Sequence, residues 1–520
     1  MTAHITKIFG PPGTGKTTWL LNKLEEVINS GVDVSRIAYL TFSVSAREEA
    51  RDRAVSRLPH INPEKFKYFK TIHGICFSEL DLGRGHVMQT DDYLEFAKFC
   101  GIQFSSDYAD DLDASGSPKG WSSSLGSSYM NVRQLAAATM LEANSNKFFE
   151  EYWPADLSIE IYQYVMAKYG EFKQDKIKFD FVDMLEMYLR TGDPLPVSHI
   201  FVDEAQDLSE IQWRLIRLFS GRSQYLYLAG DDDQAIYSFI GASQYGFLDH
   251  HADETVILSR SYRLRSTIWK FANGIIQQVG RRQNKEIDTR GDGGTINWWG
   301  MGASELIDRI TLEDVLIICP TNIQLSGIQA RLQERGISHT YKGLSVSEYA
   351  ITESFYWYHK ARKDVSIPIG AAAKILRILK LEGAKAMADQ ARLTPDDTIG
   401  KPELTDLGVL WMAGRESCDY VSNRKKHSRV NHQSFDIALK SQNIETMIQK
   451  PRVRLTTYHG SKGLEANRVV LVTDCSKPAV DYADRNPDYE RRLAYVGVTR
   501  AKEEVHISRP QTNDYMRAYR

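Results

Sequence analysis

Short runs of β-branched and aromatic residues recur along the chain, and each run ends at a cluster of polar residues. They occupy residues 36–42, 199–204, 225–231, 315–320, 453–457 and 468–474. Apolar runs of this length are typical of buried parallel strands. Apolar residues at helical spacing lie between them, so the sequence predicts an α/β fold with functional loops at the carboxyl ends of the strands.

Two stretches break this alternation and have mainly helical patterns. The simplest division of the chain is two α/β lobes, each interrupted by a helical insertion. The expected domains are residues 1–80 with 176–260 (first lobe), 81–175 (its insertion), 261–345 with 450–520 (second lobe) and 346–449 (a reduced insertion). A Gly/Ser-rich segment at 113–128 is predicted to be a mobile loop.

Composition narrows the possible surroundings and partners of the protein. The 520 residues carry a formal charge of −2, so any nucleic-acid surface has to be a local basic groove. The five cysteines include no C-x-x-C pair, which argues against a zinc site and indicates small core residues in a reducing compartment. No apolar run reaches the length of a membrane span, and no signal peptide is recognisable. We therefore expect a cytoplasmic protein without a membrane partner.

Residues 10–17 read GPPGTGKT and have the spacing of a phosphate-binding loop. An apolar stretch precedes the loop and a helical pattern follows it, which is the context that this motif requires. Three glycines would let consecutive backbone N–H groups curve around phosphate oxygens: Gly10, Gly13 and Gly15. The helix that begins here would direct its positive end at the bound anion.

Other residues of the loop have predicted roles of their own. Lys16 would reach the β- and γ-phosphates, and Thr17 would offer its hydroxyl to Mg²⁺. Thr14 and Thr18 complete the predicted nucleotide contacts of the loop. Together with the acidic string FVDEAQD at 201–207, the loop predicts that the protein hydrolyses ATP or GTP.

Eight further strings follow in order along the chain. They are LTFSVSAREEA (40–50), TIHG (71–74), FDFVDML (179–185), VDEAQD (202–207), LAGDDDQAIYSFIGA (228–242), SYRLRSTI (261–268), TTYHGSKGLE (456–465) and ERRLAYVGVTRAK (490–502). Together they resemble the UvrD/Rep/PcrA group of superfamily 1A DNA helicases, over both predicted lobes but only weakly in the insertions. The resemblance implies two RecA-like lobes of the phosphate-loop NTPase class, with ATP between them. It also implies single-stranded DNA across their top and translocation in the 3′ to 5′ direction.

The resemblance assigns roles in hydrolysis, which needs a metal ligand, a base that orients water and cations that neutralise developing charge. Asp203 matches the Mg²⁺ ligand beside Thr17, and Glu204 matches the carboxylate that activates water. Gln206 and Gln234 match positions that sense the γ-phosphate.

Four more residues match nucleotide contacts of the family. Arg263 and Arg500 match the two arginines that reach the γ-phosphate from the second lobe. Tyr262 resembles the residue that stacks on adenine, and Glu465 resembles a ribose contact. The family also has a glutamine upstream of the phosphate loop, whereas none of the nine residues before Gly10 is glutamine. How adenine is recognised therefore stays open.

A track for single strands of any sequence needs aromatic faces for bases and donors for phosphates. Phe42, Tyr237 and Phe239 match the aromatic positions, although Phe239 stands where the family usually has tryptophan. His73 and His459 match positions near the DNA backbone.

The combined prediction is an ATP-dependent motor, with Mg²⁺ as cofactor, that moves 3′ to 5′ on single-stranded DNA. It is expected to unwind single/double-strand junctions in replication, repair or recombination, as a monomer or weak dimer with unknown accessory proteins. The alternatives are a phosphate-loop ATPase switch that gates a protein assembly, and a motor that runs on RNA. A helicase–nuclease fusion is disfavoured, because the sequence has no cysteine cluster. The basic run at 424–429 is either a solvated helix face or a duplex contact.

Overall fold

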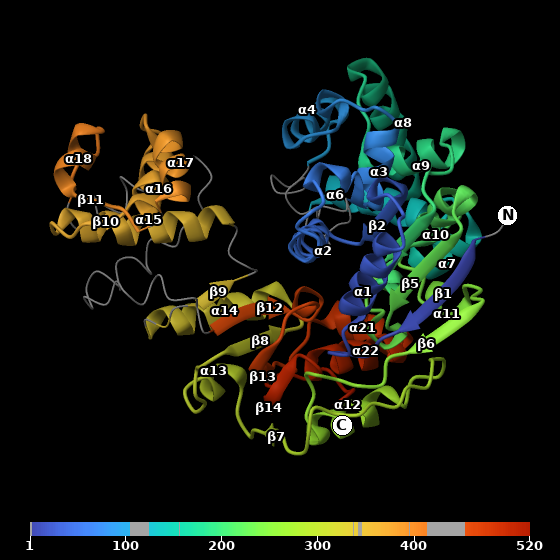
Figure 1. Cartoon of the computed structure of the whole chain (residues 1–520). Coiled ribbons are helices and arrows are strands. Elements are labelled where there is room, and N and C mark those ends of the chain that lie inside the picture. Colours follow the sequence, from blue (N-terminus) through green and yellow to red (C-terminus); the bar gives the residue numbers. More distant parts are fainter. Residues whose placement is uncertain are drawn as a thin grey trace. The chain divides into compact units, whose positions relative to one another are not determined.

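The computed structural model describes residues 3–103, 124–154, 156–335, 337, 339–341, 346–394, 396–412 and 453–519. The chain divides into two compact units (Figure 1). The first comprises residues 1–269, 273–292 and 487–495, and the second comprises residues 270–272, 293–486 and 496–520. Each unit contains a six-stranded parallel sheet. The predicted α/β fold with two parallel-sheet lobes is therefore confirmed.

The sheet of the first unit has the strand order β3-β2-β4-β5-β1-β6. Its strands are β1 (His4–Phe9), β2 (Ile37–Thr41), β3 (Tyr68–Thr71), β4 (His199–Val202), β5 (Tyr225–Gly230) and β6 (Glu254–Ile257). Because the strands are parallel, their carboxyl ends meet at one edge of the sheet. The loops that follow β1, β4 and β5 therefore lie together, and they carry most of the residues predicted to bind nucleotide.

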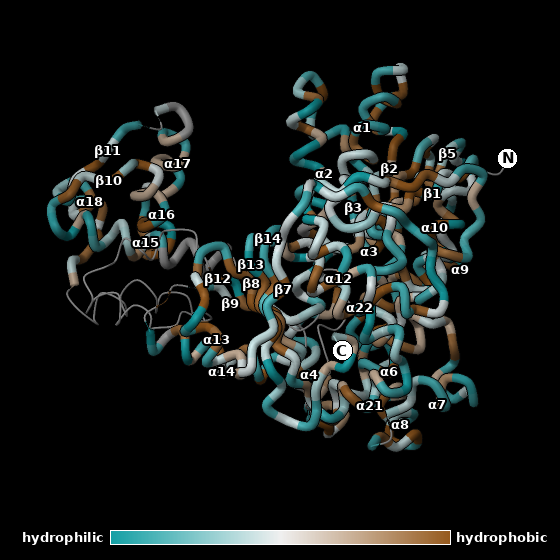
Figure 2. Tube along the Cα trace, turned by 90° about the horizontal axis from the view of Figure 1, so that it is seen from below, coloured by the Kyte–Doolittle hydropathy of each residue, from teal (hydrophilic) through white to brown (hydrophobic). Residues whose placement is uncertain are grey.

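Helices cover both faces of this sheet. They are α1 (Lys16–Asn29), α2 (Val44–Arg57), α3 (Ile72–Glu79), α9 (Phe181–Thr191), α10 (Glu210–Phe219) and α11 (Gly246–Asp249). A further helix, α12 (Ser266–Ile276), has residues in both units. Successive strand residues point to opposite faces, so Leu40 and Val202 join one core with α3, α9 and α10. Tyr39 and Phe201 join a second core with α1 and α2. The strands are correspondingly among the most hydrophobic segments of the trace (Figure 2).

The first insertion is helical throughout its described part. Its helices are α4 (Thr90–Cys100), α6 (Leu125–Thr139), α7 (Asn146–Tyr152) and α8 (Ile159–Lys176), and they share one core. The predicted loop at 113–128 is wrong at its end, because residues 125–128 form the first turn of α6. This helix buries Tyr129, Met130 and Val132, and their burial outweighs the weak helix propensity of Gly and Ser. Residues 113–123 lie outside the described residues.

The sheet of the second unit has the strand order β7-β14-β13-β8-β12-β9. Its strands are β7 (Thr295–Trp298), β8 (Val315–Cys319), β9 (His339–Tyr341), β12 (Val453–Thr457), β13 (Ala466–Leu471) and β14 (Ala501–Ile507). The associated helices are α13 (Ala303–Leu306), α14 (Asn322–Glu334), α21 (Lys477–Arg485) and α22 (Pro487–Val498). Of these, only α22 has its residues divided between the two units. Ile317, Leu455 and Val470 from three strands form a core with α13 and α14.

The second insertion is also mainly helical where it is described. It contains α15 (Val346–Arg362), α16 (Ile369–Leu379), α17 (Ala384–Leu393) and α18 (Lys401–Asp406), with a short antiparallel pair of β10 (Ile367–Pro368) and β11 (Thr398–Ile399). Phe355, Tyr358 and Leu376 belong to its separate core. The basic run at 424–429 lies outside the described residues.

Four of the five cysteines are described, and three of them are buried as predicted: Cys76, Cys100 and Cys319. Cys475 is only partly buried, because it lies in the loop after β13, so the expectation of five core cysteines is wrong there. Every helix in the described part of the chain is too short or too polar to cross a bilayer.

Candidate nucleotide and nucleic-acid sites

The phosphate loop connects the end of β1 to the start of α1. Gly13 and Gly15 have φ angles of 74° and 82°, a conformation that residues with a side chain rarely adopt. A Cβ atom on Gly10 would lie 2.0 Å from Lys16 Cγ, and one on Gly13 would lie 2.4 Å from Arg263 Cβ. The loop therefore needs glycine at these positions, and it leads into the N-terminus of α1, which attracts anions.

Thr17 and Asp203 meet although they are far apart in the sequence. Thr17 Oγ1 donates to Asp203 Oδ2 at 2.7 Å, and the Tyr39 hydroxyl donates to the same oxygen at 3.2 Å. Burial raises the pKa of Asp203, and the neighbouring charge of Glu204 raises it further. Lys16 Nζ lies 3.9 Å from Glu204 Oε1. A hydroxyl and a carboxylate this close offer the oxygen ligands that Mg²⁺ prefers beside a phosphate, so these residues fit a bound Mg²⁺ ion.

A chain of hydrogen bonds links Glu204 to Gln234. Gln206 Nε2 donates to Glu204 Oε2 at 2.7 Å, and Gln206 Oε1 accepts from the N–H of Asp231 at 2.9 Å. Asp231 Oδ2 in turn accepts from Gln234 Nε2 at 2.7 Å. Gln206 and Gln234 are both buried, on the short helices η4 (Ala205–Asp207) and η6 (Asp232–Gln234). Three residues predicted to act on the γ-phosphate therefore belong to one network.

The segment that follows β6 lies against the phosphate loop. Ser261 Oγ donates to the carbonyl of Pro12 at 2.8 Å, and the N–H of Tyr262 donates to the carbonyl of Gly13 at 2.9 Å. Arg263 follows and lies over Gly13. Tyr262 is 65% exposed, and the guanidinium of Arg260 lies 5.5 Å from its ring centroid. Tyr262 thus offers a largely exposed aromatic surface beside the loop.

The remaining predicted nucleotide residues belong to the second unit. Arg500 is 2% exposed, and its guanidinium donates to the carbonyl of Leu464 at 3.4 Å. Glu465 is the next residue and pairs with Lys502 at 2.5 Å. This unit thus brings Arg500 and Glu465 together, while His459 begins the short helix η9 (His459–Ser461) after β12.

Three partly exposed aromatic rings form a row in the first unit, here called the aromatic row: Phe42, Tyr237 and Phe239. Phe42 and Tyr237 stack with ring centroids 5.4 Å apart, and Tyr237 and Phe239 have centroids 6.5 Å apart. Phe239 lies on η7 (Ser238–Ile240) and also meets Tyr489 of α22 edge to face. Neighbouring rings of this kind can stack successive bases.

A cavity of about 50 Å³ adjoins Phe42 and has His73 and Phe181 in its wall. His73 meets Phe181 edge to face at 5.7 Å. Its burial lowers the pKa of the imidazole to about 4, so His73 is neutral at pH 7. A contact of His73 with a nucleic-acid backbone would therefore be a hydrogen bond and not an ion pair.

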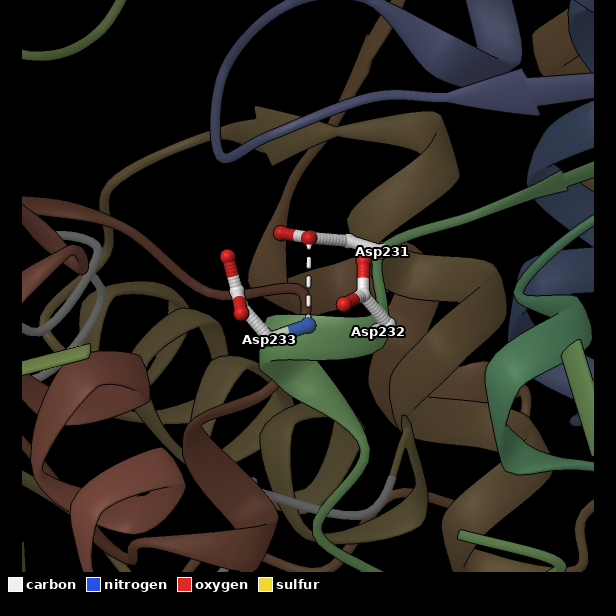
Figure 3. A group of neighbouring side chains, drawn as sticks. All are labelled: Asp231, Asp232 and Asp233. Carbon is white, nitrogen blue, oxygen red and sulfur yellow. Dashed lines mark hydrogen bonds between the residues drawn. The ribbon is translucent and has the colours of Figure 1, made fainter. Parts of the chain in front are cut away.

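An acidic triplet, Asp231 to Asp233, follows β5, and its three carboxylates lie close together (Figure 3). Lys285 Nζ lies 2.7 Å from Asp231 Oδ1 and 2.9 Å from Asp233 Oδ2. Arg282 pairs with Asp233 at 2.6 Å. Sequence analysis missed both cations. The signal was three acids directly after a buried strand, because buried carboxylates need cationic partners.

Comparison with known proteins shows the family to which the chain belongs. The family model of the UvrD/REP helicase N-terminal domain matches residues 2–254, and that of the UvrD-like helicase C-terminal domain matches residues 392–512. The chain belongs to the UvrD-like helicases of superfamily 1A. The resemblance predicted from its motifs is thereby confirmed.

Individual relatives are distant. ATP-dependent DNA helicase PcrA of Bacillus subtilis is 23% identical over 453 residues, which are 66% of this chain and 61% of PcrA. DNA helicase II of Escherichia coli is 25% identical over 404 residues, 61% of this chain and 56% of the relative. ATP-dependent DNA helicase Rep of Buchnera aphidicola is 23% identical over 412 residues, 60% of this chain and 61% of the relative. The chain thus spans about three fifths of the length of these relatives.

Proposed function

We propose that the protein is an ATP-dependent motor that moves 3′ to 5′ on single-stranded DNA and separates duplex strands at junctions. The observation that carries the proposal is the short segment from Asp231 to Phe239. It holds Gln234, which is joined to Glu204 by hydrogen bonds, and it also holds two rings of the aromatic row. One rigid stretch of backbone thus connects the hydrolytic site with a surface for bases.

ATP hydrolysis is assigned to the loop edge of the first sheet. Glu204 accepts a proton from the attacking water, while Lys16 and Arg263 neutralise charge on the transferred phosphoryl group. Thr17 and Asp203 would hold Mg²⁺, which would screen the phosphate charges when bound. In the second unit, Arg500 is proposed as a further cation for the γ-phosphate and Glu465 as a ribose contact.

DNA binding is assigned to the aromatic row. Every base has a π-face, so Phe42, Tyr237 and Phe239 can bind strands of any sequence. His73 and His459 would add contacts to the backbone of the strand. The named relatives are ATP-dependent DNA helicases, which supports DNA as the track.

Nucleic-acid-stimulated ATPase activity is the direct test. Turnover should be measured with no nucleic acid, single-stranded DNA, duplex DNA and RNA of equal length and at equal salt. The motor requires a steep rise with single-stranded DNA. Equal turnover in all four would indicate a phosphate-loop switch that gates an assembly, and a larger rise with RNA would replace DNA as the track.

A further inference from the structure

Lys285 is a fully buried charged side chain near the nucleotide site. Its side chain has 0% exposure and lies within ion-pair distance of all three carboxylates of the acidic triplet. These carboxylates raise the pKa of Lys285, outweighing the opposite effect of burial. The lysine is therefore charged at neutral pH, and it fills the position that a bound cation would take.

The surroundings of the triplet balance its charge. Arg282 pairs with Asp233 through two hydrogen bonds of 2.8 and 2.6 Å. Arg492 is 0% exposed and donates to the main-chain carbonyl of Asp232 at 3.1 Å. Two cations, Lys285 and Arg282, thus pair with the three carboxylates, and Arg492 binds a main-chain carbonyl beside them. Loss of Lys285 would leave buried carboxylate charge without compensation.

Asp231 connects this cluster to the nucleotide site, because its two carboxylate oxygens have different partners. Oδ1 accepts from Lys285 Nζ at 2.7 Å, and Oδ2 accepts from Gln234 Nε2 at 2.7 Å. Its N–H donates to Gln206, which donates to Glu204. Lys285 therefore fixes the carboxylate that orients Gln234. Two hydrogen bonds, both to Asp231, connect the lysine to the amide of Gln234.

Lys285 also has a particular place in the chain. It lies on the segment after α12, between Arg282 and Gly293, where the chain passes from the first unit to the second. The N–H of Gln283 on the same segment donates to Asp232 Oδ2 at 2.8 Å. Residues 282–285 of the first unit are thus anchored on the triplet by both side-chain and main-chain contacts.

We propose that Lys285 is a positioning residue for hydrolysis: it holds Asp231 so that Gln234 and, through Gln206, Glu204 keep the orientation needed for turnover. This inference rests on the proposed ATPase function. Lys285 touches neither nucleotide phosphate nor water in this role. Its loss should consequently lower kcat and leave nucleotide binding largely unchanged.

The test compares Lys285→Met, Lys285→Arg and a matched control, Lys173→Met. Lys173 is a nearly buried lysine of the same unit that is also shared by two carboxylates, Asp180 and Asp183, but it lies in the helical insertion. For each variant, we would measure Tm, the Kd of a nonhydrolysable ATP analogue, and kcat and KM for ATP at saturating single-stranded DNA. A misplacement of a catalytic group by about 1 Å can lower the rate by about a hundredfold.

We expect Lys285→Met to lower kcat by about tenfold to a hundredfold, with the Kd of the analogue within about threefold of wild type. Lys285→Arg should recover much of kcat, since it restores the cation. Lys173→Met should lower Tm but leave kcat within about twofold. A Lys285→Met variant with wild-type kcat would overturn the proposal.

A double variant separates positioning from folding. Asp232→Asn removes one buried carboxylate, so Lys285→Met with Asp232→Asn should regain Tm but not kcat. Recovery of kcat together with Tm would mean that Lys285 is only structural, and the proposal would be wrong. If the wild-type protein shows no ATPase activity with any nucleic acid, the proposed function is wrong. If the wild-type protein is active and Lys285→Met is equally active, only the role proposed for Lys285 is wrong.

Discussion

At the scale of single residues, Glu204 has both an unusual backbone conformation and a carboxylate held by a hydrogen bond. Its backbone has a φ of 55° and a ψ of 41°, a left-handed conformation that costs a residue with a side chain about 1 to 3 kcal/mol. Its N–H donates to Asp203 Oδ1 at 3.0 Å, and its carboxylate accepts from Gln206. These bonds hold the strained turn and direct the carboxylate toward the loop edge of the sheet.

Replacing Glu204 by glutamine should abolish turnover while preserving Mg²⁺·ATP binding. The amide has the same shape, but it cannot accept a proton from water. We expect DNA-stimulated ATPase to fall below about a tenth of wild type, a loss of more than about 1.4 kcal/mol of transition-state stabilisation. Glu210→Gln, at an exposed helix start in the same unit, is the control. More than a tenth of the activity remaining would refute the role of Glu204 as the base.

A second residue-scale prediction concerns Gly13, which lies under Arg263. In Gly13→Ala, the new methyl group would meet Arg263 Cβ at 2.4 Å, so the loop and the arginine cannot both keep their positions. Gly31→Ala is a matched control, since Gly31 has a φ of 96° but nothing within 4 Å of an added Cβ. Both changes should destabilise the fold by about 1 to 2 kcal/mol, the cost of a left-handed backbone.

Only Gly13→Ala should also impair catalysis, with kcat/KM for ATP reduced by about a hundredfold. Steady-state ATPase kinetics and thermal unfolding of both variants would distinguish the two effects. Equal kinetics in the two variants would show that the contact between Gly13 and Arg263 is not needed for hydrolysis.

At the scale of elements, the central strands of both sheets could be predicted and most edge strands could not. The six predicted runs correspond to β2, β4, β5, β8, β12 and β13. Central strands are buried on both faces, so they read as continuous apolar runs. The missed strands β3, β6, β7 and β9 are all at sheet edges, where three or four residues with one open side give a weak signal. Two inner strands are exceptions: β14 carries Lys502, Glu503 and Glu504 in its first half, and β1 was recognised only as the apolar stretch before the phosphate loop.

The candidate site shows a similar division. Short motifs revealed the residues around the phosphate loop, because phosphate binding demands fixed types at fixed spacing. Lys285 and Arg282 have no such motif. Their function depends on which carboxylates the fold brings to them, and a lone lysine in a polar segment has the same appearance as a surface residue.

Replacing a residue of the short helix η7 should separate movement along DNA from ATP binding. Phe239→Ala should weaken binding of single-stranded DNA by about 1 to 3 kcal/mol, the value of one stacked base. Basal ATPase without DNA should persist, because the hydrogen bonds that link Glu204 to Gln234 run through Gln206 and Asp231 and not through Phe239. Phe149→Ala is the control, since Phe149 is an aromatic residue with 51% exposure in the first insertion.

Fluorescence anisotropy with a labelled oligonucleotide and a strand-displacement assay measure the two effects of Phe239→Ala. We expect unwinding to suffer more than binding, because η7 follows η6 and Gln234 directly in the chain. Normal unwinding by this variant would show that Phe239 serves packing against Tyr489 and not DNA.

At the scale of the whole molecule, the formal charge of −2 provides no general attraction for nucleic acid. Binding must therefore arise from local contacts, such as the aromatic row and donors near the strand. Each unit holds part of the proposed machinery. The first holds the phosphate loop, Glu204 and the aromatic row, and the second holds Arg500, Glu465 and His459. Family membership rests on matches to both an N-terminal and a C-terminal helicase domain.

Directional movement along the strand is predicted for the molecule as a whole. Membership of this family predicts 3′ to 5′ translocation, so a duplex with a 3′ single-stranded tail should be unwound in the presence of Mg²⁺·ATP. Blunt and 5′-tailed duplexes of the same sequence should be poor substrates, because the motor would have no strand on which to move toward the junction. Glu204→Gln is the negative control, since it should bind all three duplexes and separate none. If the wild-type protein unwinds 5′-tailed duplex as fast as 3′-tailed duplex, the predicted polarity is wrong. If unwinding still depends on a tail and Glu204→Gln abolishes it, the protein is nevertheless an ATP-driven motor.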